Sequence, residues 1–121
     1  MNNLFKLISL IYLIILSSIL LIPLDFFLTT QIVEDRHQPS NNESYIIHLF
    51  LFFILYFLLN FAFQNKIKVL FFCIIYSIII EILQILTSRG FQLGDILFNL
   101  IGIVLSYLFF YFLKRIHKNT N

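Results

Sequence analysis

Charged residues are scarce in this chain of 121 residues, of which 12% are charged and 60% are hydrophobic. In soluble domains about a quarter of the residues are charged and roughly half are apolar. The shortage of charge therefore excludes an ordinary soluble domain and predicts an integral membrane protein. The net charge of +2 says little as a total, because the distribution of charge among the loops is what orients a membrane protein.

Cysteine and glycine are also rare, with one and three residues respectively. The single Cys73 lies within a hydrophobic run, so it cannot form an intramolecular disulfide or supply a pair of thiolates to a metal. Three glycines are too few for a phosphate-binding glycine loop or a dinucleotide fingerprint, and no nucleophile elbow is present. The sequence thus lacks the motifs by which many enzymes are recognised.

Four hydrophobic runs make up most of the chain, and each can cross about 30 Å of hydrocarbon as a helix. Lipid permits no other open-chain structure. We therefore predict an all-α fold: one domain, residues 1–121, forming an integral membrane bundle of four transmembrane helices. The predicted spans are residues 7–24, 45–63, 67–86 and 93–113, with an irregular loop at 25–44. The first run is too long for a signal-peptide core and has no small-residue cleavage site after it, so we expect it to be retained.

Basic residues predict the orientation, because they accumulate in cytoplasmic loops. Two of them, Arg36 and Arg89, lie in the loops after the first and third spans. The others lie at the amino end, between the second and third spans, or in the carboxyl tail: Lys6, Lys66, Lys68, Lys114, Arg115 and Lys118. This distribution predicts a multi-pass protein of the cell membrane with both termini in the cytoplasm. The basic tail is expected to contact anionic lipid, and no nucleic-acid partner is predicted.

Polar residues gather where the hydrophobic runs approach the outer surface. Six share this depth: His48, Glu81, Gln84, Arg89, Asp95 and Asn99. An ionised group within a membrane costs about 2–3 kcal/mol unless it is paired, so such residues form a functional-site hypothesis. At about 100° per residue, each of the last two spans has one polar stripe. Gly102 and Ser106 continue the stripe of the fourth span, and we expect their small side chains to hold it close to the third.

These residues suggest two kinds of role. Glu81, His48 and Asp95 are candidate catalytic residues, since adjacent carboxyl and imidazole groups can exchange protons. Arg89, Gln84 and Asn99 are candidate ligand-binding residues, because a guanidinium suits a phosphate or carboxylate at headgroup depth. The alternatives are a polar clamp between helices and an Arg89 that reaches the interface or pairs with Asp95.

Metal binding and transport are less favoured by the sequence. His48, Glu81 and Asp95 are suitable ligand types, but no pair has the spacing that marks metal-binding helices, so no metal and no cofactor are predicted. A small transporter is disfavoured because the polar groups collect at one side and leave the cytoplasmic half apolar.

The polar residues also resemble those of the VanZ-like family of small bacterial membrane proteins. The resemblance covers roughly residues 44–113, through His48, the Glu81-Ile-Leu-Gln84 segment, Arg89, Asp95, Asn99 and Gly102. It implies a cell-envelope protein, of a family named for a member linked to teicoplanin resistance, without implying a reaction. The expected partner is a membrane lipid or a lipid-linked envelope component. The alternative is a non-catalytic accessory subunit whose polar helix faces bind a partner membrane protein.

Overall fold

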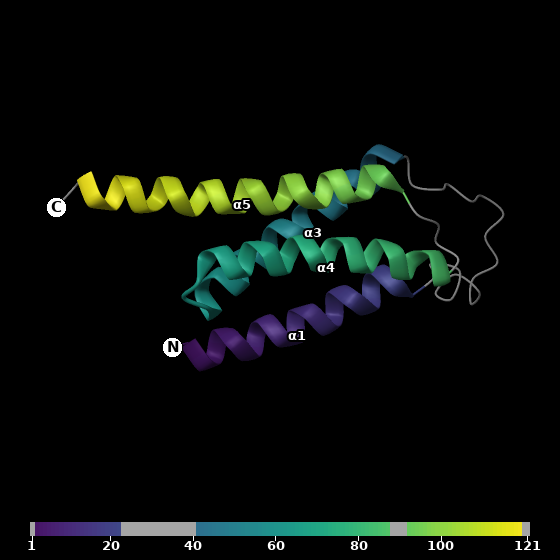
Figure 1. Ribbon diagram of the computed structural model, residues 1–121, viewed down its shortest axis with the longest axis horizontal. Helices are drawn as coiled ribbons and strands as arrows, with labels where there is room; N and C mark the ends of the chain where they lie inside the picture. Colours follow the sequence, from purple (N-terminus) through teal and green to yellow (C-terminus); the bar gives the residue numbers. More distant parts are fainter. Residues whose placement is uncertain (1, 23–40, 88–91, 120–121) are drawn as a thin grey trace.

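The computed structural model describes residues 2–22, 41–87 and 92–119. They form four helices: α1 (Asn2–Leu21), α3 (Asn41–Ala62), α4 (Lys66–Leu86) and α5 (Leu93–Asn119). All four helices are long and apolar enough to cross a membrane, and these residues contain no strand. The predicted all-α membrane bundle is therefore confirmed. Figure 1 shows the helices running side by side, with the chain termini and the α3–α4 connection at the same end.

The helix ends differ from the predicted spans because hydrophobicity predicts only the part of a helix that lies in lipid. Helix α5 continues past residue 113 to Asn119, through the basic residues of the carboxyl tail. Helix α3 begins at Asn41, so residues 41–44 are helical and do not belong to the predicted irregular loop. The rest of that loop, residues 25–40, lies outside the described residues.

The tight turn between α3 and α4 is closed by a helix cap. Residues 63–65 connect the two helices, and the side chain of Asn65 accepts a hydrogen bond from the backbone N–H of Lys68 at 3.1 Å. An asparagine cap satisfies a donor that the first turn of a helix leaves free. This short connection makes α3 and α4 antiparallel neighbours.

Helices α3 and α4 each pack against all three other helices, and the most extensive contact in the bundle is between α3 and α5. The close approach to α5 depends on Gly102. A Cβ atom at this position would collide with the backbone carbonyl oxygen of Leu49 and would lie 3.1 Å from the backbone nitrogen of Phe53. The sequence analysis expected Gly102 to bring the third and fourth spans together, and this is wrong. Gly102 faces α3, which is the second span.

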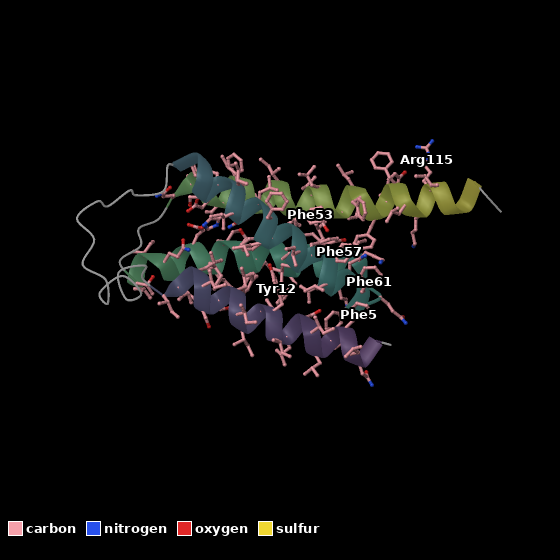
Figure 2. The ribbon with its side chains drawn as sticks, turned by 180° about the vertical axis from the view of Figure 1, so that it is seen from behind. Phe5, Tyr12, Phe53, Phe57, Phe61 and Arg115 are labelled. Atoms are coloured by element: carbon pink, nitrogen blue, oxygen red, sulfur yellow. The ribbon has the colours of Figure 1, made fainter. Side chains whose placement is uncertain are left out.

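The interior and the outer faces of the bundle are both largely apolar. Leu16, Phe52 and Leu55 are among the buried core residues, whereas Ile14, Phe50 and Phe71 are more than half exposed. Such an exterior is stable in a hydrocarbon solvent. Aromatic rings join the helices near the end that holds the termini, where Phe61 of α3 stacks on Phe5 of α1 with ring centroids 5.2 Å apart. Figure 2 shows Phe53, Phe57 and Phe61 following one another along α3.

Candidate functional site

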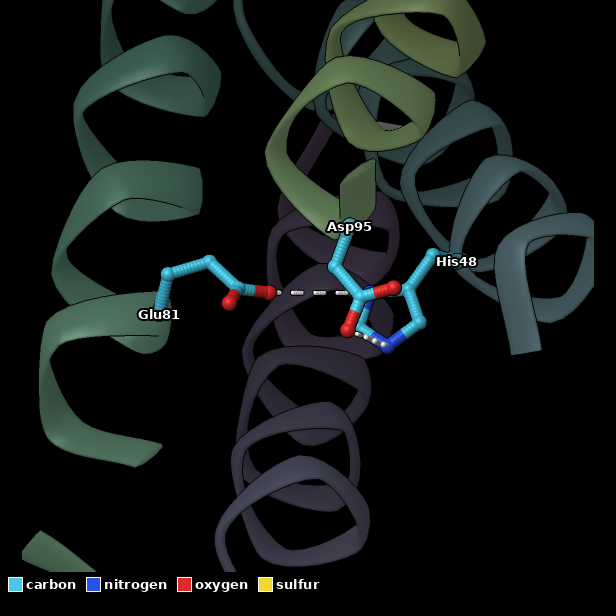
Figure 3. Close-up of side chains that lie close together, drawn as sticks. All are labelled: His48, Glu81 and Asp95. Carbon is cyan, nitrogen blue, oxygen red and sulfur yellow. Dashed lines mark ion pairs between the residues drawn. The ribbon is translucent and has the colours of Figure 1, made fainter. Parts of the chain in front are cut away.

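Three ionisable side chains from three helices meet inside the bundle. His48 comes from α3, Glu81 from α4 and Asp95 from the first turn of α5. Their exposed fractions are 4%, 0% and 6%. Figure 3 shows dashed lines from the imidazole of His48 to one oxygen of each carboxyl group. We refer to His48, Glu81, Asp95 and the adjacent Asn99 as the polar cluster.

The imidazole of His48 connects the cluster. Its Nδ1 lies 3.0 Å from Oδ1 of Asn99 and 3.9 Å from Oε1 of Glu81. Its Nε2 lies 3.5 Å from Oδ2 of Asp95. Since an amide oxygen can only accept, Nδ1 donates to Asn99, and Nε2 is the nitrogen that faces Asp95. Asn99 thereby determines how the ring is oriented.

The local sequence explains how α5 positions its two cluster residues. Asp95 lies in the first turn of the helix, where a negative charge is favoured by the helix dipole. Asn99 lies one turn further along the same face, and Gly102 follows after almost one more turn. Because Gly102 allows α5 to touch the backbone of Leu49, the neighbouring residue His48 is brought within hydrogen-bond distance of Asn99.

The cluster combines one imidazole with two carboxyl groups, and groups of these two kinds can exchange protons. His48, Glu81 and Asp95 each offer a ligand atom for a metal ion, and these atoms lie within 4.8 Å of one another.

The structure separates one predicted site residue from the cluster. Gln84 is buried on the same face of α4 as Glu81, but its Nε2 donates to the backbone carbonyl of Leu20 in α1 at 3.1 Å. In this arrangement the amide connects α4 to α1. Arg89 lies outside the described residues. Of the six predicted residues, the structure thus brings together His48, Glu81, Asp95 and Asn99.

The sequence analysis assigned no polar contact to the first span, although α1 makes several. The hydroxyl of Tyr12 donates to the carbonyl of Leu51 in α3 at 2.8 Å. The hydroxyls of Ser17 and Tyr76, from α1 and α4, are also 2.8 Å apart. A sign of these contacts was available in the sequence, because Tyr12 and Ser17 are among the few polar residues of a largely apolar run.

A second polar region lies toward the opposite end of the bundle, near the α3–α4 connection. It contains a cavity of about 290 Å³ lined by Tyr56, Asn60, Phe61, Lys66, Tyr107, Phe110, Tyr111 and Lys114. Asn60 is 4% exposed. The sequence analysis expected the half of the bundle opposite the polar cluster to be apolar, and this is wrong, because the side chain of Asn60 of α3 is buried there.

Comparisons with known proteins identify the family. No curated protein and no solved structure matched the chain. A family model described as VanZ/LLP1 matches residues 5–114, which includes the polar cluster and all four helices in large part. The chain is a multi-pass membrane protein that belongs to the VanZ/LLP1 family.

Proposed function

We propose that the polar cluster binds or modifies a lipid-linked or surface component of the bacterial envelope, and that this lowers susceptibility to teicoplanin-type glycopeptides. The observation that carries the proposal is the convergence of His48, Glu81 and Asp95 from three helices at one place in an apolar bundle. Helix association alone does not require this, because single polar contacts within membranes contribute under about 1 kcal/mol on average.

The arrangement of His48 favours proton exchange over a passive clamp. Asn99 occupies Nδ1, so Nε2 is directed at Asp95, which is at the amino end of α5 and is the most exposed of the three ionisable groups. A ligand group that enters at this end of the helix meets Asp95 first. Asp95 and His48 would then pass a proton between them, with Glu81 compensating the charge of the imidazole. In this proposal Arg89 contributes a guanidinium for an anionic headgroup.

The geometry gives less support to an accessory subunit that binds a partner helix through its polar stripes. Ser77, Glu81 and Asn99 are fully buried within the chain. Their faces are covered by neighbouring helices of the same bundle, so a partner would have to displace those helices before it could contact them.

The test uses isosteric substitutions that remove ionisation and keep hydrogen bonding. We expect Glu81→Gln and Asp95→Asn to return the teicoplanin inhibitory concentration of an expressing host to that of the empty vector, with unchanged protein in the membrane. Gln84→Leu is the matched control, since it removes a buried polar group that lies outside the cluster. As long as this variant accumulates in the membrane, it should still protect the host against teicoplanin. If both isosteric variants protect as well as the parent, the cluster is a structural clamp and the proposal fails.

A further inference from the structure

We infer that the cavity near the α3–α4 connection binds the phosphate headgroup of an anionic phospholipid. This inference goes beyond the proposed function, because the cavity lies toward the end of the bundle opposite the polar cluster (Figure 1). Residues of α3, α4 and α5 line the cavity, so its walls come together only when these three helices are packed. Basic pockets between membrane helices are a recurrent kind of site for anionic lipid headgroups.

Two lysines give the cavity a positive charge. Lys66 begins α4 and Lys114 lies near the end of α5, and both line the cavity. The acidic residues of the described helices are Glu43, Glu81 and Asp95, and all three lie toward the opposite ends of α3, α4 and α5. No acidic residue of these helices is therefore placed to pair with either lysine. A bound anion would attract both ammonium groups and offset the repulsion between them.

The ammonium group of Lys66 is held at the wall of the cavity. Its Nζ donates to the backbone carbonyl of Asn60 at 3.4 Å and lies 5.6 Å from the centroid of the Phe110 ring. An ammonium group has three N–H donors, so two of them remain for a ligand. Lys114 is exposed, and its three donors are bonded to no described residue. Both lysines can thus donate charge-assisted hydrogen bonds to phosphate oxygens.

Two uncharged polar side chains in the cavity wall are buried with unsatisfied atoms. Tyr56 is fully buried and Asn60 is 4% exposed. Neither the hydroxyl of Tyr56 nor the amide oxygen of Asn60 has a hydrogen-bond partner within the described part of the chain. Leaving such groups buried and unpaired costs free energy. A headgroup in the cavity would satisfy them, because the Tyr56 hydroxyl can donate to a phosphate oxygen and the Asn60 oxygen can accept from a headgroup hydroxyl.

The rest of the wall favours a lipid over a soluble anion. It consists of aromatic rings, and two of these residues, Phe61 and Tyr111, are 43% and 54% exposed on the outside of the bundle. The cavity is therefore bordered by the apolar surface that faces hydrocarbon. Its volume of about 290 Å³ is at the lower end of the range of about 300–1,000 Å³ for small-molecule sites. This size suits a headgroup whose acyl chains stay outside in the bilayer.

The experiment measures lipid binding by native mass spectrometry on the full-length protein, purified and delipidated in detergent. We expect one phosphatidylglycerol per chain, with weaker binding of phosphatidylcholine that has the same acyl chains. Lys66→Gln and Lys114→Gln should each lower the affinity at least about tenfold. Lys68→Gln and Arg115→Gln are the matched controls, since each removes an exposed charge near the same end that does not line the cavity. They should change the affinity by less than about twofold.

Tyr56→Phe gives a readout that a purely structural role would not move. It should weaken phosphatidylglycerol binding at least about twofold, because one hydrogen bond to the headgroup is lost. The midpoint of unfolding of the lipid-free protein should stay nearly unchanged. Every variant must elute as a single species on gel filtration, so that lost binding is not mistaken for unfolding.

Inorganic phosphate distinguishes a lipid site from a site for a free anion. Added to the phosphatidylglycerol complex, it should displace no more lipid than chloride at the same ionic strength. Specific displacement by phosphate would show a site for the free anion, and the lipid assignment would fail. The inference is also overturned if phosphatidylcholine binds as tightly as phosphatidylglycerol, or if Lys68→Gln and Arg115→Gln weaken binding as much as Lys66→Gln and Lys114→Gln do.

Discussion

At the scale of single residues, buried tyrosines in this bundle fall into two kinds. Tyr12 is partly buried, and its hydroxyl donates to the carbonyl of Leu51 in another helix at 2.8 Å. Tyr56 is fully buried, lines the cavity near the α3–α4 connection, and its hydroxyl has no hydrogen-bond partner among the described residues. The ring of each tyrosine contributes to packing, but only the hydroxyl of Tyr12 joins two helices. Removing each hydroxyl therefore tests whether the hydrogen bond matters.

We predict that Tyr12→Phe lowers the free energy of unfolding by about 0.5–1 kcal/mol, which is the usual range for a polar contact between membrane helices. Tyr56→Phe should change it by less, because no contact among the described residues is lost. Cys73 gives a convenient probe, since it is the only cysteine and is fully buried. A thiol-reactive fluorescent dye will label it on heating in detergent, and the midpoint of labelling reports unfolding. A larger shift for Tyr56→Phe than for Tyr12→Phe would contradict this assignment.

At the scale of helices, the contact between α3 and α5 determines the geometry of the polar cluster. Gly102 has no side chain, and the backbone of α3 at Leu49 occupies the space that one would need. His48 is adjacent to Leu49 and reaches Asn99 of α5 at 3.0 Å. A wider separation of the two helices would therefore lengthen this hydrogen bond as well as reduce the packing.

We predict that Gly102→Ala destabilises the protein by about 2–3 kcal/mol, because the obstructing atom is a backbone oxygen that cannot move without displacing a helix. Gly94→Ala is the matched control. A Cβ atom there meets the outer atoms of the Tyr45 ring at 2.6 Å, and a side chain can rotate away, so the cost should be less than about 1 kcal/mol. The same dye assay on Cys73 measures both variants. Equal midpoints for the two would show that α5 does not need this close approach.

The sequence predicted the existence of the helices better than their contacts. The apolar runs were sufficient to predict four spans, because the membrane allows only helices there. The polar stripes also predicted that Glu81 and Asp95 would turn inward. The pattern of hydrophobic residues, however, predicts only how deep a residue lies in the membrane and whether its side chain faces the interior of the bundle. It does not predict which neighbouring helix that side chain contacts. For this reason Gly102 was assigned to the wrong partner, and the bond from Gln84 to Leu20 of α1 was not foreseen.

At the scale of the whole molecule, the two ends of the bundle differ in chemistry. The polar cluster lies toward one end, where α4 finishes and α5 begins. Lys66 and Lys114 line the cavity toward the other end, which also holds both chain termini (Figure 1). Lysines at the ends of membrane helices favour the cytoplasmic side. The distribution of charge therefore predicts that the polar cluster opens to the outside and the cavity to the cytoplasm.

We predict that an impermeant maleimide applied to intact cells labels Gln92→Cys and does not label Gln64→Cys, both made in a Cys73→Ser background. Gln92 precedes α5 and Gln64 lies in the α3–α4 connection, and both are exposed. Permeabilised cells are the control, because both positions should then react to the same extent. This pattern places the termini in the cytoplasm, since Gln64 and the termini share one end of the bundle. The opposite pattern would put His48, Glu81 and Asp95 near the cytoplasmic surface, where a surface component of the envelope could not reach them.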